Sequence, residues 1–211
     1  MKTVAIIGCG NLGQAIAEGL IDSSTDYQIA ATRRNLKAIQ YLADKGVKTT
    51  SDNREAVQGA DIIVVAVKPY NVEEILKEVG DLITPGALLV SVATGVSIES
   101  MKSHVTPGVL VYRAMPNTAA AVKESITTVC YEDSAADRAS EVMALFDGIG
   151  QPVVIREDLM DAATVLGACG IAYAMRFIRA MTQGGIQIGF SAQMASLIAS
   201  QTVKGAAELL S

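Results

Sequence analysis

The sequence predicts an α/β fold, in which a doubly wound and mainly parallel sheet is followed by a smaller all-helical domain. Strand-like apolar runs alternate with amphipathic helical segments up to about Ile155, and no strand pattern appears after Arg156. One run, residues 61–67, is apolar on both faces, as buried parallel strands are. Such alternation indicates right-handed crossovers that place a ligand at the carboxyl ends of the strands. We therefore predict two domains, residues 1–155 and 156–211.

The individual elements follow from the apolar runs and the turn residues between them. Strands are expected at residues 4–7, 27–31, 47–49, 61–67, 87–93, 109–114, 127–131 and 152–155, the last at an edge of the sheet. Helices are expected from the first glycines through residue 20 and over residues 35–45, 53–58 and 72–82. In the second domain, alanine and glycine crowd the helical surfaces, which suits close packing against a partner chain.

Residues 8–13 carry the most specific motif, a G-x-G-x-x-G sequence between the first strand and the first helix. Gly8 permits the tight turn, Gly10 lets the backbone approach a pyrophosphate, and Gly13 lets the helix and strand pack closely. The pyrophosphate would lie on free N–H groups at the helix N-terminus. The motif predicts a Rossmann-type dinucleotide-binding domain. The alternative is a glycine-rich turn that binds nothing.

The end of the second strand indicates which dinucleotide binds. Thr32 is followed by Arg33 and Arg34. In folds that prefer NAD, an Asp or Glu stands about 20 residues after the glycines and binds the ribose 2′-hydroxyl. This chain offers two guanidinium groups instead, and arginine pairs well with phosphate. The sequence therefore favours NADPH over NADH, and the alternative is a pair of solvated arginines that open the next helix.

Three later strand ends supply further candidates, because ligands bind at the carboxyl edge of such sheets. After the fourth strand, we expect Pro69 to stop the chain from continuing as strand or helix. Lys68 is expected near the phosphates or the nicotinamide, the alternative being a surface lysine. The small residues 92–95 would admit a flat nicotinamide ring. Residues 115–117 follow the sixth strand, and the amide of Asn117 both donates and accepts hydrogen bonds.

Other kinds of chemistry find little support in the sequence. His104, the single histidine, follows a helical stretch and is expected at the surface, far from the strand ends. The sequence has no nucleophile elbow, no cluster of metal ligands and no paired carboxylates. We therefore expect neither a covalent nor a metal-assisted mechanism.

The composition restricts the partners and the compartment. Hydrophobic residues make up 50% of the 211 residues and charged residues 18%, below the usual quarter, which indicates apolar surface covered in an oligomer. A net charge of −5 without a basic stripe argues against nucleic acid. Glutamines and a Gly-Gly pair interrupt residues 180–203, so no membrane span is expected there. Three widely spaced cysteines fit the reducing cytoplasm.

Several motifs taken together resemble one known family, pyrroline-5-carboxylate reductase, among the two-domain reductases similar to 6-phosphogluconate dehydrogenase. The motifs are residues 8–13, 66–69, 115–118 and 161–164, with glycines and Gln-Thr in the last helices. The resemblance implies hydride transfer from NADPH or NADH to a cyclic imine, giving L-proline, and an active site across a homodimer or a larger oligomer. A protonated imine is already electrophilic, so the protein mainly orients donor and acceptor and excludes water.

The fingerprint, the arginines and the resemblance together define the expected site. The expected cofactor-binding residues are Ile7, Gly8, Cys9, Gly10, Asn11, Leu12, Gly13, Thr32, Arg33, Arg34, Asn53, Ala66, Val67, Lys68, Pro69, Val92, Ala93 and Thr94. The expected substrate pocket comprises Met115, Pro116, Asn117, Cys169 and Gly170.

Two departures from the family pattern keep alternatives open. Residues 167–173 read G-A-C-G-I-A-Y where the family usually has S-G-S-G-P-A-Y, and no S-P-G-G-T-T loop is found before Ser211. Either the chain is truncated, or it is a shortened relative without the loop that holds the substrate carboxylate. One alternative is therefore a non-catalytic NADP-binding regulatory or scaffold protein. A β-hydroxyacid dehydrogenase is a third reading, disfavoured because no lysine lies between Asp161 and Ala180.

Overall fold

In the part of the chain that the structure describes, eight strands form one sheet in the order β3-β2-β1-β4-β5-β6-β7-β8. Strands β1 to β6 are parallel, whereas β7 runs antiparallel to β6 and parallel to β8. The strands are β1 (Lys2–Ile7), β2 (Tyr27–Thr32), β3 (Lys48–Thr50), β4 (Ile62–Val65), β5 (Leu88–Ser91), β6 (Leu110–Met115), β7 (Ser125–Tyr131) and β8 (Gly150–Val154). The doubly wound, mainly parallel sheet is therefore confirmed, with β8 at an edge as predicted. The computed structural model describes residues 1–23 and 26–210.

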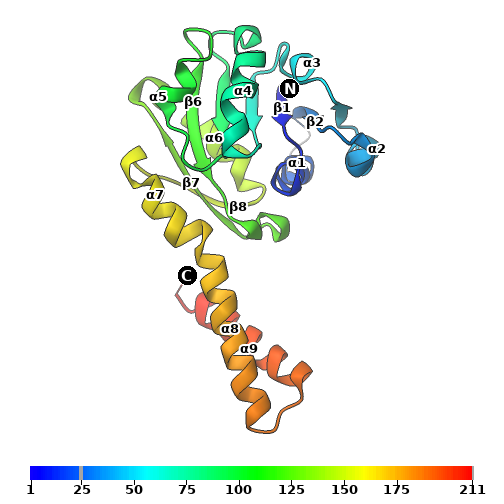
Figure 1. Cartoon of the computed structure of the whole chain (residues 1–211), viewed down its shortest axis with the longest axis vertical. Helices are drawn as coiled ribbons and strands as arrows, with labels where there is room; N and C mark the ends of the chain where they lie inside the picture. The colour runs from blue at the N-terminus through cyan, green and yellow to red at the C-terminus, as the bar shows by residue number, and fades with distance from the viewer. Residues whose placement is uncertain (24–25, 211) are drawn as a thin grey trace. The chain divides into compact units, whose positions relative to one another are not determined.

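Helices cover both faces of this sheet (Figure 1). The α-helices are α1 (Asn11–Ser23), α2 (Gln40–Asp44), α3 (Asn53–Val57), α4 (Pro69–Val79), α5 (Ile98–Lys102), α6 (Ala139–Asp147), α7 (Met160–Ala163), α8 (Gly170–Gln187) and α9 (Ala192–Glu208). The 3₁₀ helices are η1 (Leu36–Ile39), η2 (Gly80–Leu82), η3 (Thr118–Val122), η4 (Asp133–Arg138) and η5 (Glu157–Leu159), and η6 (Thr164–Ala168) is a π-helical turn.

Pro69 starts a helix, so the prediction that it would stop the chain from continuing as one was wrong. It occupies the first turn of α4, where a missing N–H group costs nothing because that group has no intrahelical acceptor. The expected helix over residues 72–82 therefore begins earlier and ends in η2. The segment expected as one helix over residues 35–45 is likewise divided into η1 and α2.

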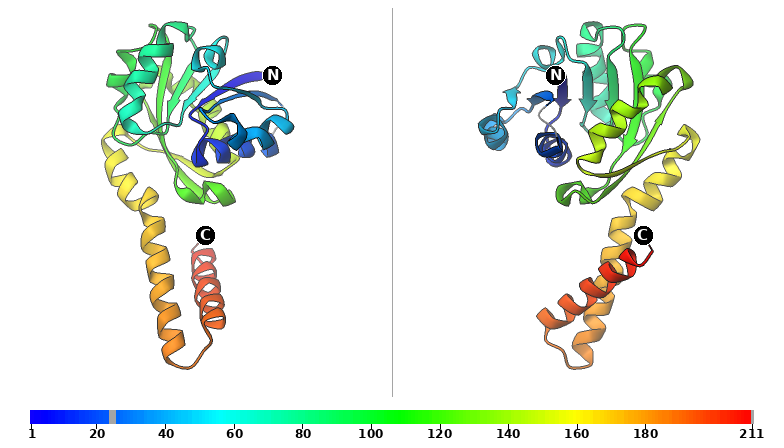
Figure 2. Two further views of the ribbon diagram at one scale, coloured as in Figure 1. Left: turned by 45° about the vertical axis from the view of Figure 1, so that its right-hand side comes forward. Right: turned by 180° about the vertical axis from the view of Figure 1, so that it is seen from behind.

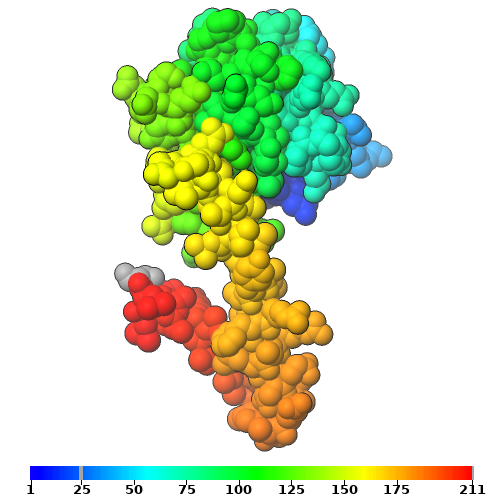
Figure 3. Space-filling view, turned by 60° about the vertical axis from the view of Figure 1, so that its left-hand side comes forward, coloured from blue at the N-terminus to red at the C-terminus, as the bar shows by residue number. Residues whose placement is uncertain are grey.

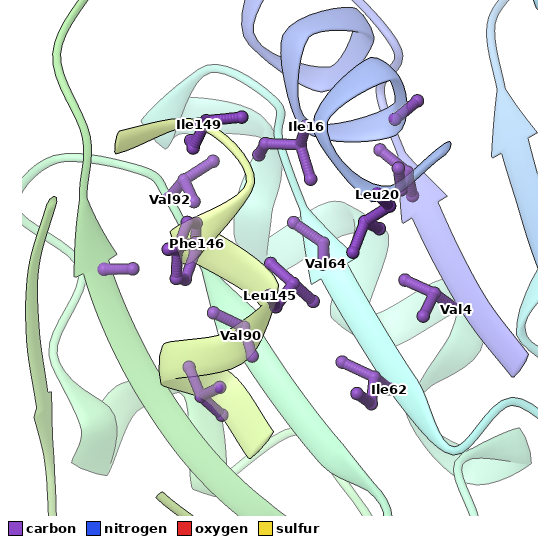
Figure 4. Close-up of a cluster of buried hydrophobic side chains, with 14 of the residues drawn as sticks. Val4, Ile16, Leu20, Ile62, Val64, Val90, Val92, Leu145, Phe146 and Ile149 are labelled. Carbon is purple, nitrogen blue, oxygen red and sulfur yellow. The ribbon is translucent and has the colours of Figure 1, made fainter. Parts of the chain in front are cut away.

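Alternate residues of each strand face opposite sides of the sheet, and this builds two apolar cores. Helices α1, α2 and α6 cover one face, and α3, α4 and α5 cover the other. In the first core, Ile16 and Leu20 of α1 lie with Leu145 and Phe146 of α6 over the strand residue Val64 (Figure 4). All five side chains are fully buried, so the sheet is held from both sides within one chain.

Residues Glu157 to Ala168 pack on the sheet although they follow the last strand. The chain divides into the compact units Met1–Ala168 and Cys169–Ser211, so the division falls later than the predicted domain boundary at 155/156. The difference has a physical cause, because Met160 is buried in the second core and Glu157 pairs with Arg113 of β6. The strand pattern in the sequence ends near Ile155, whereas the packing of the chain on the sheet continues to Ala168.

The second unit is a hairpin of α8 and α9, which lie side by side (Figure 2). Close approach depends on small residues, since a Cβ atom on Gly185 would lie only 2.9 Å from the Cβ of Ala195. A left-handed Gly189, with φ of +107°, makes the turn, and the Ser191 hydroxyl then accepts a hydrogen bond from the Met194 N–H group. Figure 3 shows the side chains of α8, drawn in orange, at the surface.

Candidate dinucleotide-binding site

The glycine loop joins β1 to α1, and its three glycines meet different surroundings. Gly8 has a φ of +87°, and a Cβ there would lie 2.5 Å from Val67 Cγ1. A Cβ on Gly13 would lie 2.9 Å from the Gly8 carbonyl oxygen, which is the close approach of helix and strand. At Gly10 the nearest atom would be 4.0 Å away. The space beside Gly10 can therefore admit a ligand, as the backbone cradle for a pyrophosphate requires.

Side chains at the end of β2 hold this loop in place. The Thr32 hydroxyl accepts a hydrogen bond from Gly8 N (3.2 Å) and donates one to Asn53 Oδ1 (2.8 Å). Arg33 Nη1 donates to the Cys9 carbonyl oxygen at 3.0 Å. Thr32, Arg33 and Asn53 were all expected at the cofactor site. In the structure, Thr32 and Arg33 bond directly to the glycine loop, and Asn53 bonds to Thr32. Arg33 thereby binds one carbonyl of the loop and places its positive charge beside the loop.

A groove of about 330 Å³ opens beside the loop. Its lining residues are Ile7, Gly8, Thr32, Arg33, Arg34, Ser51, Asn53, Val67, Asn71, Glu74, Ile75 and Glu78. Seven of these were predicted from the sequence. The guanidinium groups suit a phosphate, and hydroxyl and carboxylate oxygens suit ribose hydroxyls. The groove therefore fits the adenosine end of a dinucleotide.

The sequence analysis missed the wall of the groove that α4 provides. Asn71, Glu74 and Glu78 lie on one side of this helix, and Glu78 Oε2 accepts a hydrogen bond from Asn53 Nδ2 at 3.0 Å. Their spacing of three and four residues is a helical signal. Asn71 fell outside the helix expected over residues 72–82, because Pro69 was taken as a stop. Glu74 and Glu78 lay within that helix, but only the folded chain shows that this side of it faces the groove.

The loops after β4 and β5 lie next to each other at the carboxyl edge of the sheet. Val92 N donates to the Val65 carbonyl at 3.1 Å, and Ala93 N donates to Ser91 Oγ at 3.2 Å. Thr94 and Lys68 are both exposed. The two strands adjoin in the sheet, so the structure brings the predicted residues 66–69 and 92–94 to one edge, where a nicotinamide ring would lie.

The turn after β6 buries the three residues that were expected in the substrate pocket. Met115, Pro116 and Asn117 are all buried. Asn117 Oδ1 accepts from Ala119 N at 2.9 Å, and Asn117 Nδ2 donates to the Gly167 carbonyl at 3.2 Å. Both ends of this amide therefore bond within the protein.

Cys169 and Gly170, the other two residues expected in the substrate pocket, belong to the second unit, at the start of α8. Their assignment to a substrate pocket stays a prediction.

The thiol of Cys9, in the glycine loop, is not an activated nucleophile. Burial raises the pKa of the Cys9 thiol to about 11, so this cysteine stays protonated near neutral pH. Among residues 1–23 and 26–210, no group of three metal-ligating side chains occurs.

His104 is less exposed than expected. It is partly buried and lines a hollow of about 230 Å³ together with Gly95 and Val96, directly after Thr94. The expectation that it lies far from every strand end was therefore wrong.

Comparison with protein families divides the chain in two. Residues 3–95 match the family described as NADP oxidoreductase, coenzyme F420-dependent, and residues 157–211 match pyrroline-5-carboxylate reductase dimerisation. The first match covers the glycine loop, the arginines and the groove, and the second covers the helical hairpin.

Individual relatives agree along the whole chain. Pyrroline-5-carboxylate reductases 1 and 2 of Dictyostelium discoideum are 41% and 39% identical over 98% and 99% of this chain, which spans 40% and 76% of their lengths. A solved pyrroline-5-carboxylate reductase of Coxiella burnetii superposes with a TM-score of 0.92 at 29% identity, covering 98% of this chain and 78% of that one. The Plasmodium falciparum pyrroline carboxylate reductase with NADP bound gives a TM-score of 0.86 at 26% identity, covering 99% and 78%.

Proposed function

The chain is an oxidoreductase of the pyrroline-5-carboxylate reductase family that uses NAD(P)H, and we propose that it reduces 1-pyrroline-5-carboxylate to L-proline with NADPH. The observation that carries the proposal is the glycine loop with open space beside Gly10, next to a groove lined by Arg33 and Arg34. The loop supports dinucleotide binding, and the similarity to pyrroline-5-carboxylate reductases along the chain supports the cyclic imine as substrate.

The reaction needs positioning more than acid–base catalysis. NADPH held at the glycine loop and the groove would supply a hydride, and a protonated cyclic imine needs no further activation to accept one. The main tasks of the chain are to hold the nicotinamide at the ends of β4 and β5, to orient the imine beside it and to exclude water. We assign the cofactor to residues 7–13, 32–34, 53, 66–69 and 92–94.

NADPH is favoured over NADH, although NADH also fits the loop. The preference rests on Arg33 and Arg34, which line the groove where the ribose 2′-phosphate would lie. NADH lacks that phosphate, so neither guanidinium group would have an anion at this position to pair with.

The helical unit provides an interface, and we propose a homodimer through α8 and α9 that can assemble further. The dimerisation match supports this proposal. The helical stretch Glu157–Gln187 is also long and apolar enough to cross a membrane by length and composition, with no part of its most apolar window buried. A second copy of the chain accounts for this apolar surface, and we place the enzyme in the cytoplasm, where its free cysteines stay reduced.

The test is the oxidation of NADPH by the full natural chain, with and without 1-pyrroline-5-carboxylate, together with detection of proline. We expect oxidation that depends on the imine and yields one proline per NADPH. Tight NADPH binding without turnover would contradict the proposal and favour a non-catalytic NADP-binding relative.

A further inference from the structure

We propose that Arg113 and Asn117 are positioning residues, which hold the segment Glu157–Ala168 on the sheet so that hydride transfer can occur. Arg113 lies in β6, and Asn117 lies in the turn that follows it. The inference rests on the proposed reduction of the imine. It also gives Asn117 a role different from the substrate contact that the sequence predicted.

The side chain of Asn117 bonds within the protein through both its oxygen and its nitrogen. It is 7% exposed, its Oδ1 caps η3 through Ala119 N, and its Nδ2 donates to the Gly167 carbonyl. Its backbone N–H group donates to Ser125 Oγ at 2.9 Å, which fixes the turn itself. A buried amide that is bonded at both its oxygen and its nitrogen is poorly placed to contact a substrate. It can instead fix the position of Gly167.

Gly167 belongs to the π-helical turn η6, which interrupts the helical stretch between α7 and α8. Such turns break the regular hydrogen-bond ladder and often lie at functional sites. Asn117 Nδ2 donates a hydrogen bond to a backbone carbonyl of this turn from outside the helical stretch. The bond therefore determines where this irregular turn lies on the sheet.

Arg113 fixes the beginning of the same segment. Its side chain is 8% exposed, and its Nη1 donates to Glu157 Oε1 at 2.8 Å. The same carboxylate oxygen accepts a hydrogen bond from Ile98 N at 2.9 Å. Within the part of the chain that the structure describes, Arg113 Nε is buried without a partner. Glu157 is thus the main compensation for a buried charge, and moving it away is costly.

A third contact lies between these two anchors. Thr128 Oγ1 approaches Met160 Sδ at 3.9 Å, and Met160 is buried. On the other side of β6, Thr94 Oγ1 approaches Met115 Sδ at 3.8 Å. Strand β6 therefore connects the anchored segment to the loop where the nicotinamide is expected. The glycine loop, in contrast, follows β1, which β4 and β5 separate from β6 in the sheet.

Two isosteric substitutions test the anchors separately. Asn117→Asp keeps an acceptor for Ala119 N but sets an oxygen against the Gly167 carbonyl. Glu157→Gln keeps a side-chain oxygen for Ile98 N but removes the charge opposite Arg113. The measurements are kcat and KM for the imine, the Kd of NADPH, and hydrogen exchange of the amides in residues 160–168, all on the full chain.

We expect both variants to show faster exchange in this segment and a loss in kcat/KM of about 100-fold, the size of effect that a displacement of about 1 Å produces. The Kd of NADPH should stay within about twofold of the wild type, because the glycine loop is untouched. The double variant should lose less than the product of the single losses, since both residues hold one segment. Ser97→Ala, which removes a similar cap bond to Ser100 N in α5, should leave all the measurements unchanged.

Three other results would each contradict a different part of the proposal. A raised KM in Asn117→Asp with normal exchange would show that Asn117 contacts the substrate. Faster exchange with an unchanged kcat/KM would show that the anchors serve stability alone. A wild-type chain without turnover would overturn the proposed function, and the exchange measurements would still report whether the two bonds hold the segment. If Asn117→Asp does not fold, Asn117→Ala, which removes both bonds without adding a charge, takes its place in the comparison.

Discussion

In the first unit, Met1–Ala168, strand side chains on both faces of the sheet are buried by helices of the same chain. In the second unit, Cys169–Ser211, the buried hydrophobic residues among those the structure describes are Ala195 and Ala199, whereas Phe177 and Leu197 are exposed by 60% and 61%. Both units are rich in apolar residues. The difference teaches that apolar composition predicts that a surface will be covered, but not whether the same chain or a second copy covers it.

The largest effect is expected inside the first unit, at the glycine loop. Gly8→Ala puts a Cβ on a left-handed residue and within 2.5 Å of Val67 Cγ1. Backbone strain and the steric clash together should weaken NADPH binding by at least about 100-fold. Dimerisation should not change. Isothermal titration with NADPH measures the first effect, and sedimentation measures the second.

Gly86→Ala is the matched control for this prediction. Gly86 has the same φ of +87°, but its Cβ would meet nothing within 4 Å. The variant therefore has the same backbone strain, but it has no steric clash and does not line the groove. If it weakened NADPH binding as much as Gly8→Ala, the local explanation would be wrong.

The reverse effect is expected in the second unit. Phe177→Asp introduces a charge into the exposed apolar surface of α8. Loss of a central aromatic contact typically costs about 2 kcal/mol or more, about 30-fold in the dimer dissociation constant. NADPH binding by the first unit should persist. Sedimentation over a range of concentrations measures the change, and thermal unfolding of the wild type should depend on concentration.

Arg179→Asp is the control, because it replaces a side chain of α8 that is already charged and exposed. A dimer that survived Phe177→Asp would show that another surface covers the hairpin.

A smaller and more selective effect is expected at the end of β2. The double variant Arg33→Asp with Arg34→Ser should weaken NADPH about 10-fold more than NADH, because only NADPH carries the 2′-phosphate. Both cofactors should lose some affinity, since Arg33 also bonds the Cys9 carbonyl. Fluorescence titrations with each cofactor measure the ratio. Equal losses would refute the assignment, and Lys37→Asp in η1 controls for the lowered net charge nearby.

The smallest effect concerns the pH dependence of the first unit. Paired hydrogen bonds from Arg138, with a further bond from Lys2, lower the pKa of Glu141 from 4.5 to about 2. Because the folded-state pKa is depressed, the added stability is present above pH 4.5 and is lost as the pH falls towards 2. Urea unfolding should show Glu141→Gln to be about 1 kcal/mol less stable at pH 7 than the wild type.

The difference should shrink at pH 3, where the exposed variant Glu124→Gln serves as the control. A constant difference across this range would mean that the ion pairs of Glu141 do not stabilise the fold.

The sequence by itself determined the strand set, the parallel sheet and the glycine loop of this protein. These features follow from local patterns, since alternation, apolar runs and left-handed glycines act within a few residues. The same holds for the position of Arg33 and Arg34 after β2. The start of α4 at Pro69 is also a local signal, because proline is common in the first turn of helices. The prediction there was wrong because proline also ends strands, and only that role was considered.

Only the tertiary structure decided the contacts between residues far apart in the chain. It joined Arg113 to Glu157 and Asn117 to Gly167, and it brought α4 to the wall of the groove. Such contacts depend on strand order and on where crossovers return, which no local pattern specifies. The division after Ala168 has the same origin, because the segment from Glu157 is held by partners in β6 and β7 rather than by its own sequence.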